Sequence, residues 1–443
     1  MDTKLKNVFD EPSIWKILFK IAPPVMFAQL IQAMYNIVDS FFVGRYSGEG
    51  LSALAVIYPI QLIIVAIAVG TGVGVNTQMS QDYANKRIDK ANNCAGTGTI
   101  LAIVSWLIFA IISFLTLRFY VEMTVTSQNA INDALTYGNI VCLGSIGIFL
   151  ESVWSKVHQA IGNMKLPMIA QVLGALTNIV LDPILIFGLF SFPKLGIAGA
   201  AIATVAGQIV AAIVTSSGFR KPPLLKYFGC YAKNIYQLGF PNIFMQLLFT
   251  VYIVALNIIL GTFSDEAVSV LGLYYKIQSF FFIPLYALQT CVVPLLSYTY
   301  TLNKRRRCLE VLNKEMLLSA IFMFVGVICF EFFPKNLLQI FSRNLKVLEI
   351  GIPAFKIIGL SFFPAVVSLS MPVFFQAVGK GKPSILLSII RQIFCLIPIF
   401  YLLSKINLNL TWYAFPISET VTGGIGLILL YKQLQIWKQE GLN

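Results

Sequence analysis

The chain repeats itself once along its length. A shift of 217 positions, which carries Pro24 onto Pro241, aligns residues 21–44 with residues 238–261 without a gap. The identical residues in this segment pair Pro24 with Pro241, Phe27 with Phe244, Gln29 with Gln246, Leu30 with Leu247, Tyr35 with Tyr252 and Gly44 with Gly261. The same shift still aligns residues 159–165 with residues 376–382. Two copies of one half predict a fold made of two pseudo-symmetric parts.

The composition of the chain indicates that it lies in a membrane. Of the 443 residues, 57% are hydrophobic and only 12% are charged, and the mean hydropathy is +0.80. This is too little charge to cover a water-soluble globule. A bilayer core of about 30 Å is crossed by about 20 helical residues. We expect apolar spans near 15–42, 51–80, 93–118, 134–158, 166–190, 195–218, 234–261, 268–300, 312–333, 350–376, 384–403 and 411–433.

These stretches predict an all-α, polytopic membrane protein with about twelve transmembrane helices, six in each repeat. We expect two pseudo-symmetric six-helix bundles, the N-terminal one at 1–218 and the C-terminal one at 234–443. The segment 219–233 combines Pro222, Pro223 and Gly229 with basic residues and is expected to be a cytoplasmic linker loop. Duplicated membrane bundles are typical of secondary transporters.

The basic residues are distributed by side rather than gathered in one patch. The net charge is +13, and Lys and Arg concentrate in alternate connections, at 4–20, 86–90, 220–233, 304–307 and 380–382. This pattern indicates positive-inside topology and not nucleic-acid binding, although Lys335, Arg343 and Lys346 share one connection on the other side. We therefore expect a multi-pass protein of the plasma (inner) membrane, a monomer in the lipid bilayer with both termini cytoplasmic.

Two acids lie inside apolar spans, where ionisable groups are costly and point to function. Counted from the cytoplasmic edge, Asp39 lies roughly 28 Å up the first helix and Asp182 roughly 26 Å up the fifth. Tyr35 and Asn178 precede them by one turn on the same faces. Facing acids in a low dielectric cannot both stay ionised, so the pair predicts uptake of a proton or a Na⁺. The alternatives are an interfacial Asp39 beside Arg45, and a turn or kink formed by Asp182 with the proline that follows it.

A third acid and several aromatic residues suggest a substrate cavity. Glu151, roughly 18 Å up the fourth helix, either lines this cavity or is satisfied by a serine one turn away or by Lys156. In the second half we expect Gln278, Phe281 and Gln376 to line it. Such walls suit flat, lipophilic organic cations through apolar contact and cation–π attraction. The alternative is that the phenylalanines only pack or face lipid.

Two further features concern the helices themselves. Pro24 lies low in the first helix, where its missing N–H permits a bend that would move Asp39; a static bend is the alternative. In the second half, Arg391 and Glu419 count to similar depths and are expected to pair. A buried pair of this kind more often fixes helix packing than binds substrate.

The chain shows no pattern of a resident metal or cofactor. Its seven cysteines have neither metal-ligand nor disulfide spacing, and His158 is the only histidine. We expect no cofactor, and no metal site beyond a Na⁺ held by Asp39, Asp182 and Asn178. A membrane-embedded enzyme is disfavoured, because no nucleophile with a base can be assembled from these residues.

Five motifs carry a family resemblance. They are His158-Gln-Ala-Ile-Gly-Asn-Met-Lys-Leu-Pro-Met168, Asn178-Ile-Val-Leu-Asp182-Pro183, Gly199-Ala-Ala-Ile-Ala-Thr204, Pro294-Leu-Leu-Ser-Tyr-Thr-Tyr300 and Phe375-Gln-Ala-Val-Gly-Lys-Gly-Lys-Pro383. Together they are similar to helix signatures of the multidrug and toxic compound extrusion (MATE) transporters, and the resemblance covers nearly the whole chain. Pro24, Tyr35 and Asp39 resemble the first-helix residues of the branch whose N-terminal lobe carries the cation site.

The resemblance implies export of organic cations in exchange for H⁺ or Na⁺, with Asp39, Asp182, Asn178, Tyr35 and Thr204 forming the coupling site in the N-terminal lobe. The rival is a flippase for lipid-linked oligosaccharide within the same superfamily. A flippase cavity is expected to hold several Arg or Lys residues for pyrophosphate, whereas most basic residues here lie in connections. The pattern therefore favours the antiporter. A simple channel would not explain why the two acids are confined to one half.

Overall fold

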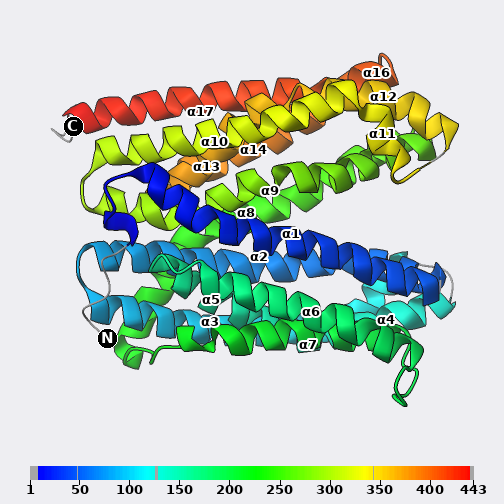
Figure 1. Cartoon of the computed structure of the whole chain (residues 1–443), viewed down its shortest axis with the longest axis horizontal. Coiled ribbons are helices and arrows are strands. Elements are labelled where there is room, and N and C mark those ends of the chain that lie inside the picture. Colours follow the sequence, from blue (N-terminus) through cyan, green and yellow to red (C-terminus); the bar gives the residue numbers. More distant parts are fainter. Residues whose placement is uncertain (1–7, 47, 125–127, 343, 440–443) are drawn as a thin grey trace. The chain divides into compact units, whose positions relative to one another are not determined.

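The computed structural model describes residues 8–46, 48–124, 128–342 and 344–439, and every regular element within these ranges is helical. Ten helices are long and apolar enough to cross a membrane, and two bent helix pairs bring the number of spans among the described residues to as many as twelve. The predicted all-α, polytopic membrane fold is confirmed. Figure 1 shows that the long helices within each half of the chain run along one another.

The first repeat forms a short helix and seven long ones. They are η1 (Val8–Asp10), α1 (Ile14–Tyr46), α2 (Gly48–Ala84), α3 (Ile88–Thr124), α4 (Gln128–Gly144), α5 (Ile146–Ala160), α6 (Lys165–Phe187) and α7 (Ile197–Thr215), followed by the single turn η2 (Ser216–Gly218). α1, α2 and α6 continue through internal prolines, which the membrane setting tolerates.

The second repeat contains corresponding helices with more interruptions. They are α8 (Leu225–Gly261), α9 (Asp265–Thr301), α10 (Arg305–Phe332), α11 (Pro334–Gln339), α12 (Leu345–Gly359), α13 (Phe362–Ala377), α14 (Gly381–Ile389), the π-helical segment η3 (Ile390–Leu396), α15 (Ile397–Ser404), α16 (Leu408–Thr411) and α17 (Ala414–Gln439).

One span in each repeat is broken at the same place. α4 and α5 meet at an angle of 41°, and α12 and α13 meet at 56°. The shift of 217 carries Gly144, the last residue of α4, onto Ser361, which directly precedes α13. At the first break, the Ser145 hydroxyl donates to the Cys142 carbonyl at 2.7 Å and so satisfies an oxygen near the end of α4. The repeated break shows that the duplication reaches the irregular backbone as well as the helices.

The chain divides into two compact units, and α1 and α8 each contribute to both. The first unit contains Ile21–Gln246, and the second contains Phe9–Lys20 together with residues 247–439. This division differs from the expected bundles at 1–218 and 234–443, because the start of α1 belongs to the second unit and the start of α8 to the first. The segment 219–233 is also not a loop throughout, since α8 begins at Leu225.

Glycines explain why the start of α8 belongs to the first unit. Gly239 of α8 lies against the backbone oxygen of Gly70, and Gly74 lies against the backbone oxygen of Ile235, so closely that an added Cβ at either glycine would collide. Small residues of this kind allow membrane helices to approach closely. Ile235 is fully buried in a cluster formed by α2, α3 and α5.

The N-terminal residues of the second unit pack against the beginning of α10 and the end of α9. Phe9 is buried, and its ring lies 5.7 Å from that of Tyr298. The Tyr298 hydroxyl donates to Asp10 Oδ1 at 2.9 Å, and Arg307 Nη2 donates to the Phe9 carbonyl at 3.0 Å. These contacts explain why the first turns of α1 belong to the second unit.

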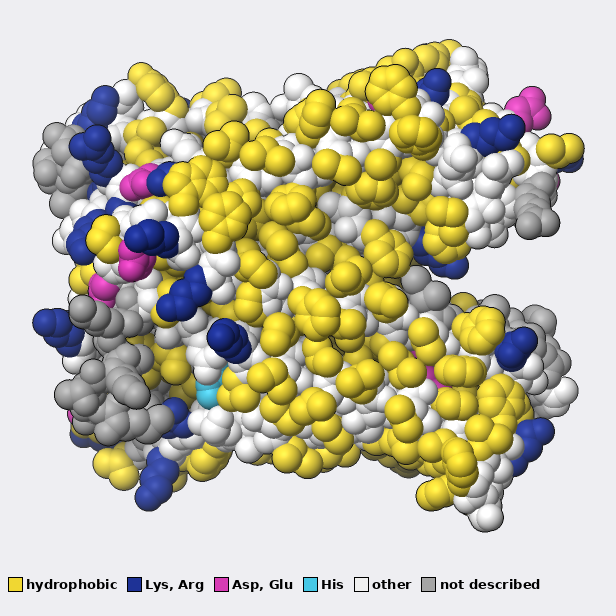
Figure 2. All heavy atoms as spheres, viewed as in Figure 1, with side chains coloured by type: hydrophobic (Ala, Val, Ile, Leu, Met, Phe, Trp, Pro, Cys, Tyr) yellow, Lys and Arg dark blue, Asp and Glu magenta, His cyan; other side chains and the backbone are white. Residues whose placement is uncertain are grey.

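The outward faces of the helices suit a lipid environment. On α3, Phe114, Leu115, Phe119 and Met123 are each about 70% exposed. Such a surface is unsuitable for water over a whole helix and suitable for acyl chains. Figure 2 shows hydrophobic side chains along the visible helices of each unit, with Lys and Arg mainly towards the helix ends.

Candidate functional site

The two intramembrane aspartates come together inside the first unit. Asp39 on α1 is 9% exposed and Asp182 on α6 is fully buried, and their carboxyl groups lie within hydrogen-bonding reach of each other. The second oxygen of Asp39, Oδ1, has no hydrogen-bond partner within the described part of the chain. Because a carboxylate has only acceptor oxygens, a hydrogen bond between two carboxyls requires a proton on one of them.

Arg45 is not the ion-pair partner of Asp39, and Asp182 does not form a turn that ends its helix. A bend of α6 at Pro183 stays an alternative. Arg45 lies over the ring of Phe41, 5.0 Å from its centroid, and makes no ion pair with Asp39 among the described residues. Asp182 lies inside α6, which continues through Pro183 and ends at Phe187. Both carboxyls are therefore buried helix residues.

Asn178 and Thr204 complete one side of the pair. Asn178 precedes Asp182 by four residues on the same face of α6, and Thr204 lies on the neighbouring α7. With its amide oriented to suit both partners, the Asn178 nitrogen donates to Asp182 Oδ2 at 3.3 Å and its oxygen accepts from the Thr204 N–H at 3.2 Å. The Asn178 amide thus keeps the Asp182 carboxyl in place.

Two tyrosines enclose the other side, and one of them was not expected from the sequence. Tyr35 lies one turn before Asp39 on α1, as predicted. Tyr137 on α4 is buried, accepts a hydrogen bond from Gln61 Nε2 at 3.3 Å, and lies within hydrogen-bonding reach of Thr204. Gln61, the donor to Tyr137, was not expected at the site either. The sequence does carry a signal for it, because the shift of 217 aligns Gln61 with Gln278.

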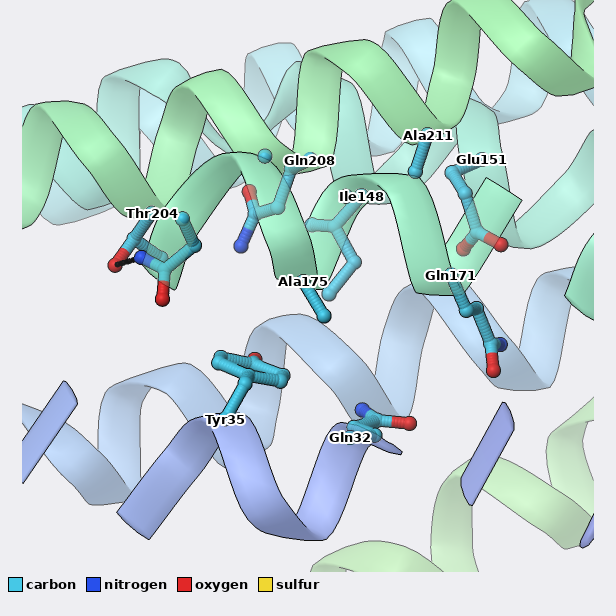
Figure 3. Close-up of a pocket in the computed structure, with 12 residues that line it drawn as sticks. Gln32, Tyr35, Ile148, Glu151, Gln171, Ala175, Thr204, Gln208 and Ala211 are labelled. Atoms are coloured by element: carbon cyan, nitrogen blue, oxygen red, sulfur yellow. Dashed lines mark hydrogen bonds between the residues drawn. The ribbon is translucent and has the colours of Figure 1, made fainter. Parts of the chain in front are cut away.

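A cavity of about 100 Å³ adjoins this site within the first unit. It lies among α1, α5, α6 and α7 and is lined by Gln32, Tyr35, Ile148, Glu151, Gln171, Gly174, Ala175, Asn178, Thr204, Gly207, Gln208 and Ala211. Figure 3 shows Glu151 and Gln171 together at one end, Thr204 at the other, and Tyr35 and Gln32 projecting from α1. The cavity therefore connects the surroundings of the aspartates with a third acid.

Seven of the twelve residues that line the cavity have a polar or ionisable side chain. Glu151 accepts a hydrogen bond from the Ser155 hydroxyl at 2.6 Å, and Lys156 donates to Gln159 at 2.8 Å. The buried Oε1 of Gln208 has no hydrogen-bond partner among the described residues. Among the described residues of this lining, Glu151 is the one acid and none is Arg, Lys or His. Lys156 lies outside the lining and interacts electrostatically with Glu151.

The other residues expected to line the substrate cavity belong to the second unit. These residues, Gln278, Phe281 and Gln376, do not line the cavity that contains Glu151. The Phe281 ring packs 5.7 Å from the ring of Phe330, and Gln376 is 2% exposed. Their part in a substrate cavity together with Glu151 stays a prediction.

The remaining expectations concern structure more than chemistry. Pro24 lies within α1, which is helical from Ile14 to Tyr46; its role in bending remains a prediction. Arg391 and Glu419 form the expected ion pair, with Nη2 2.7 Å from Oε1. His158 Nε2 lies 3.2 Å from the Ser217 hydroxyl, and the described residues contain no cluster of three metal-ligating side chains.

Comparison with known proteins gives consistent matches along the chain. A profile of the MatE family matches residues 24–184 and 241–402. The chain is 26% identical over 407 residues to the "Probable multidrug resistance protein NorM" of Thermotoga maritima, covering 89% of this chain and 86% of that protein. It is 24% identical over 432 residues to the "Multidrug export protein MepA" of Staphylococcus haemolyticus, covering 96% and 94%.

A solved structure has the same fold. It is described as the "Outward-facing conformation of a multidrug resistance MATE family transporter of the MOP superfamily". The TM-score is 0.91 at 20% sequence identity, and the match covers 98% of this chain and 99% of that one.

Proposed function

Because the chain belongs to the MatE family of membrane transporters, we propose that it is a secondary active antiporter that exports lipophilic organic cations in exchange for H⁺ or Na⁺ by alternating access. The observation that carries this proposal is the facing pair Asp39 and Asp182, buried beside a cavity that has one further acid and no basic residue. The names of two relatives, one a multidrug resistance protein and one a multidrug export protein, support the substrate class.

The carboxyl pair is the proposed coupling site. Two carboxylates within hydrogen-bonding reach repel each other strongly in low dielectric, so the pair holds one cation. A proton sits between the carboxyls, or a Na⁺ takes its place. For the Asn178 oxygen to be a further Na⁺ ligand, this amide must turn so that its oxygen, rather than its nitrogen, faces Asp182. Tyr35 and Thr204 border the site from α1 and α7.

The adjoining cavity is the proposed substrate site. Glu151 supplies a negative charge, Tyr35 an aromatic face, and Ile148, Ala175 and Ala211 an apolar wall. A cation at Glu151 and a cation at the aspartates repel each other, which favours binding of one at a time. Mutual exclusion of this kind is what exchange requires.

Substrate entry requires the four helices around the cavity to separate. The cavity measures about 100 Å³, whereas pockets for drug-sized ligands measure about 300–1,000 Å³. Pro24 in α1 gives this helix a point at which to bend. Binding of the coupling cation at Asp39 would then be linked to the size of the cavity.

The proposal includes the topology and assembly expected from the sequence. The protein acts as a monomer in the plasma membrane, with both termini on the cytoplasmic side. The concentration of Lys and Arg in alternate connections supports this orientation.

Transport in proteoliposomes tests the function. A pH gradient and a Na⁺ gradient are imposed separately, and ethidium movement is followed by fluorescence. We expect one of the two gradients to drive ethidium against its concentration gradient. The proposal fails if neither gradient drives transport while the protein restores growth to a strain lacking a flippase for lipid-linked oligosaccharide.

A further inference from the structure

The second unit contains a buried acid that the sequence pattern does not reveal. Glu315 on α10 is 1% exposed and lies ten residues after Arg305, where the helix begins. At about 1.5 Å per residue this is roughly 15 Å along the helix, inside the candidate span Arg305–Phe332. Charged residues up to Lys314 precede Glu315, so the sequence suggests that Glu315 ends a polar loop between two helices. In the structure, however, its side chain is enclosed by protein.

Two serine hydroxyls bind one oxygen of this carboxyl. Ser319 Oγ, one turn later on α10, and Ser370 Oγ on α13 each donate to Glu315 Oε1 at 3.1 Å. The other oxygen, Oε2, is buried and has no hydrogen-bond partner within the described chain. Both serines are themselves buried, so water does not freely reach the group.

A second acid of the same unit shows how a buried carboxylate is balanced. Glu419 on α17 accepts hydrogen bonds from Arg391 Nε at 3.0 Å and Nη2 at 2.7 Å, and a further one from the Ser368 hydroxyl. α13 thus provides Ser368 to Glu419 and Ser370 to Glu315. The two acids differ in that only Glu419 has a cationic partner.

Among the described residues, no fixed positive charge is placed to neutralise Glu315. α13 contains no ionisable residue. On α9, α11 and α12, which also pack against α10, the described Lys side chains are exposed: Lys276, Lys335, Lys346 and Lys356. On α10 itself, Arg306 is exposed, Lys314 pairs with Glu310, and Arg305 and Arg307 donate to backbone carbonyls. None of the ion pairs among the described residues includes Glu315.

An ionised carboxylate in this position would carry the full penalty of a buried, unpaired charge. We propose that Glu315 is the centre of a second cation site, which binds H⁺ or Na⁺ in the second unit. A proton would sit on Oε2, the oxygen without a partner. A Na⁺ would be held by the two carboxyl oxygens with the Ser319 and Ser370 hydroxyls, which can turn their lone pairs towards it.

This site does not depend on the proposed roles of the first-unit aspartates. Asp39 and Asp182 face each other, whereas Glu315 faces hydroxyl groups only. The shared feature is a buried carboxyl that lacks a fixed counter-charge. The sequence pattern had confined ion binding to the first repeat, and Glu315 adds a site in the second.

Infrared difference spectroscopy of the reconstituted full-length protein tests the proposal. The carboxylic-acid C=O stretch is recorded in a pH titration with K⁺ as the only alkali cation, and in a Na⁺ titration at constant pH. Wild-type protein is compared with Glu315→Gln and with the control Glu310→Gln, whose acid is an exposed residue of the same helix. Bands from the aspartates cancel in this comparison.

We expect one acid band that is present in the wild type and in Glu310→Gln and absent from Glu315→Gln. For a proton site the band is lost as the pH rises, and for a Na⁺ site it is converted to a carboxylate band when Na⁺ is added. Ser370→Ala, which keeps the acid and removes one donor, should shift the midpoint of either titration. A band that Glu315→Gln does not remove, or one that changes with neither pH nor Na⁺, would overturn the proposal.

Discussion

Replacement of Asp182 by Asn should uncouple transport while leaving the fold intact. The change is isosteric, and the new amide can still hydrogen-bond to Asn178 and Asp39. It removes one of two charges that face each other at hydrogen-bonding distance. Two unit charges about 4 Å apart repel by about 4 kcal/mol at an effective dielectric constant of about 20.

This repulsion is what makes the pair bind a cation. Since about 1.4 kcal/mol corresponds to a tenfold change in an equilibrium constant, Asp182→Asn should weaken binding of the coupling cation by up to about a thousandfold. Gradient-driven ethidium transport in proteoliposomes should therefore be lost. Size-exclusion profiles in detergent should match those of the wild type.

The control is Asp89→Asn, which changes an exposed aspartate at the start of α3. It should transport at the wild-type rate with the same dependence on the driving gradient. If Asp182→Asn also retains the wild-type rate and gradient dependence, the pair is not the coupling site and the electrostatic reasoning is wrong.

Three further predictions concern packing and topology. Arg391→Gln should lower the free energy of unfolding by about 3–5 kcal/mol, because it leaves the Glu419 carboxylate buried and unpaired. The double variant Arg391→Met with Glu419→Met should recover most of this stability. Thermal unfolding in detergent compares the two variants, and equal losses of stability would contradict the argument. Gly239→Ala should lower thermal stability, because the added Cβ meets the Gly70 carbonyl, while Gly229→Ala in the same helix has open space and should be neutral or stabilising by up to about 1 kcal/mol; a neutral Gly239→Ala would refute the close contact. In a cysteine-free background, Lys226→Cys should react with an impermeant thiol reagent from the cytoplasmic side only. Labelling from the outside would contradict the proposed topology.

The duplication and the apolar spans are enough to predict the fold class. Twelve spans were expected, and ten helices with two bent pairs are found among the described residues. A long apolar segment has few alternatives to a helix in a bilayer, because every backbone N–H and C=O must be bonded within the segment. The pairing of Asp39 with Asp182 was foreseeable for a related reason, since helix rise alone sets their similar depth.

The sequence could not decide which side chains share a surface across helices. Gly239 and the start of α8 belong to the first unit because of glycine contacts with α2, and no pattern within α8 predicts this partner. Tyr137 reaches the aspartate site from α4, because packing between helices sets the rotation of each helix about its axis.

The burial of Glu315 is a further property that the sequence could not predict. Its neighbours in sequence are charged, which suggests a connection near the membrane surface, yet α13 covers it and supplies Ser370. Depth along a helix can be read from spacing because the rise per residue is constant. Burial and hydrogen-bond partners depend on the neighbouring helix, and only the tertiary structure decides which helix that is.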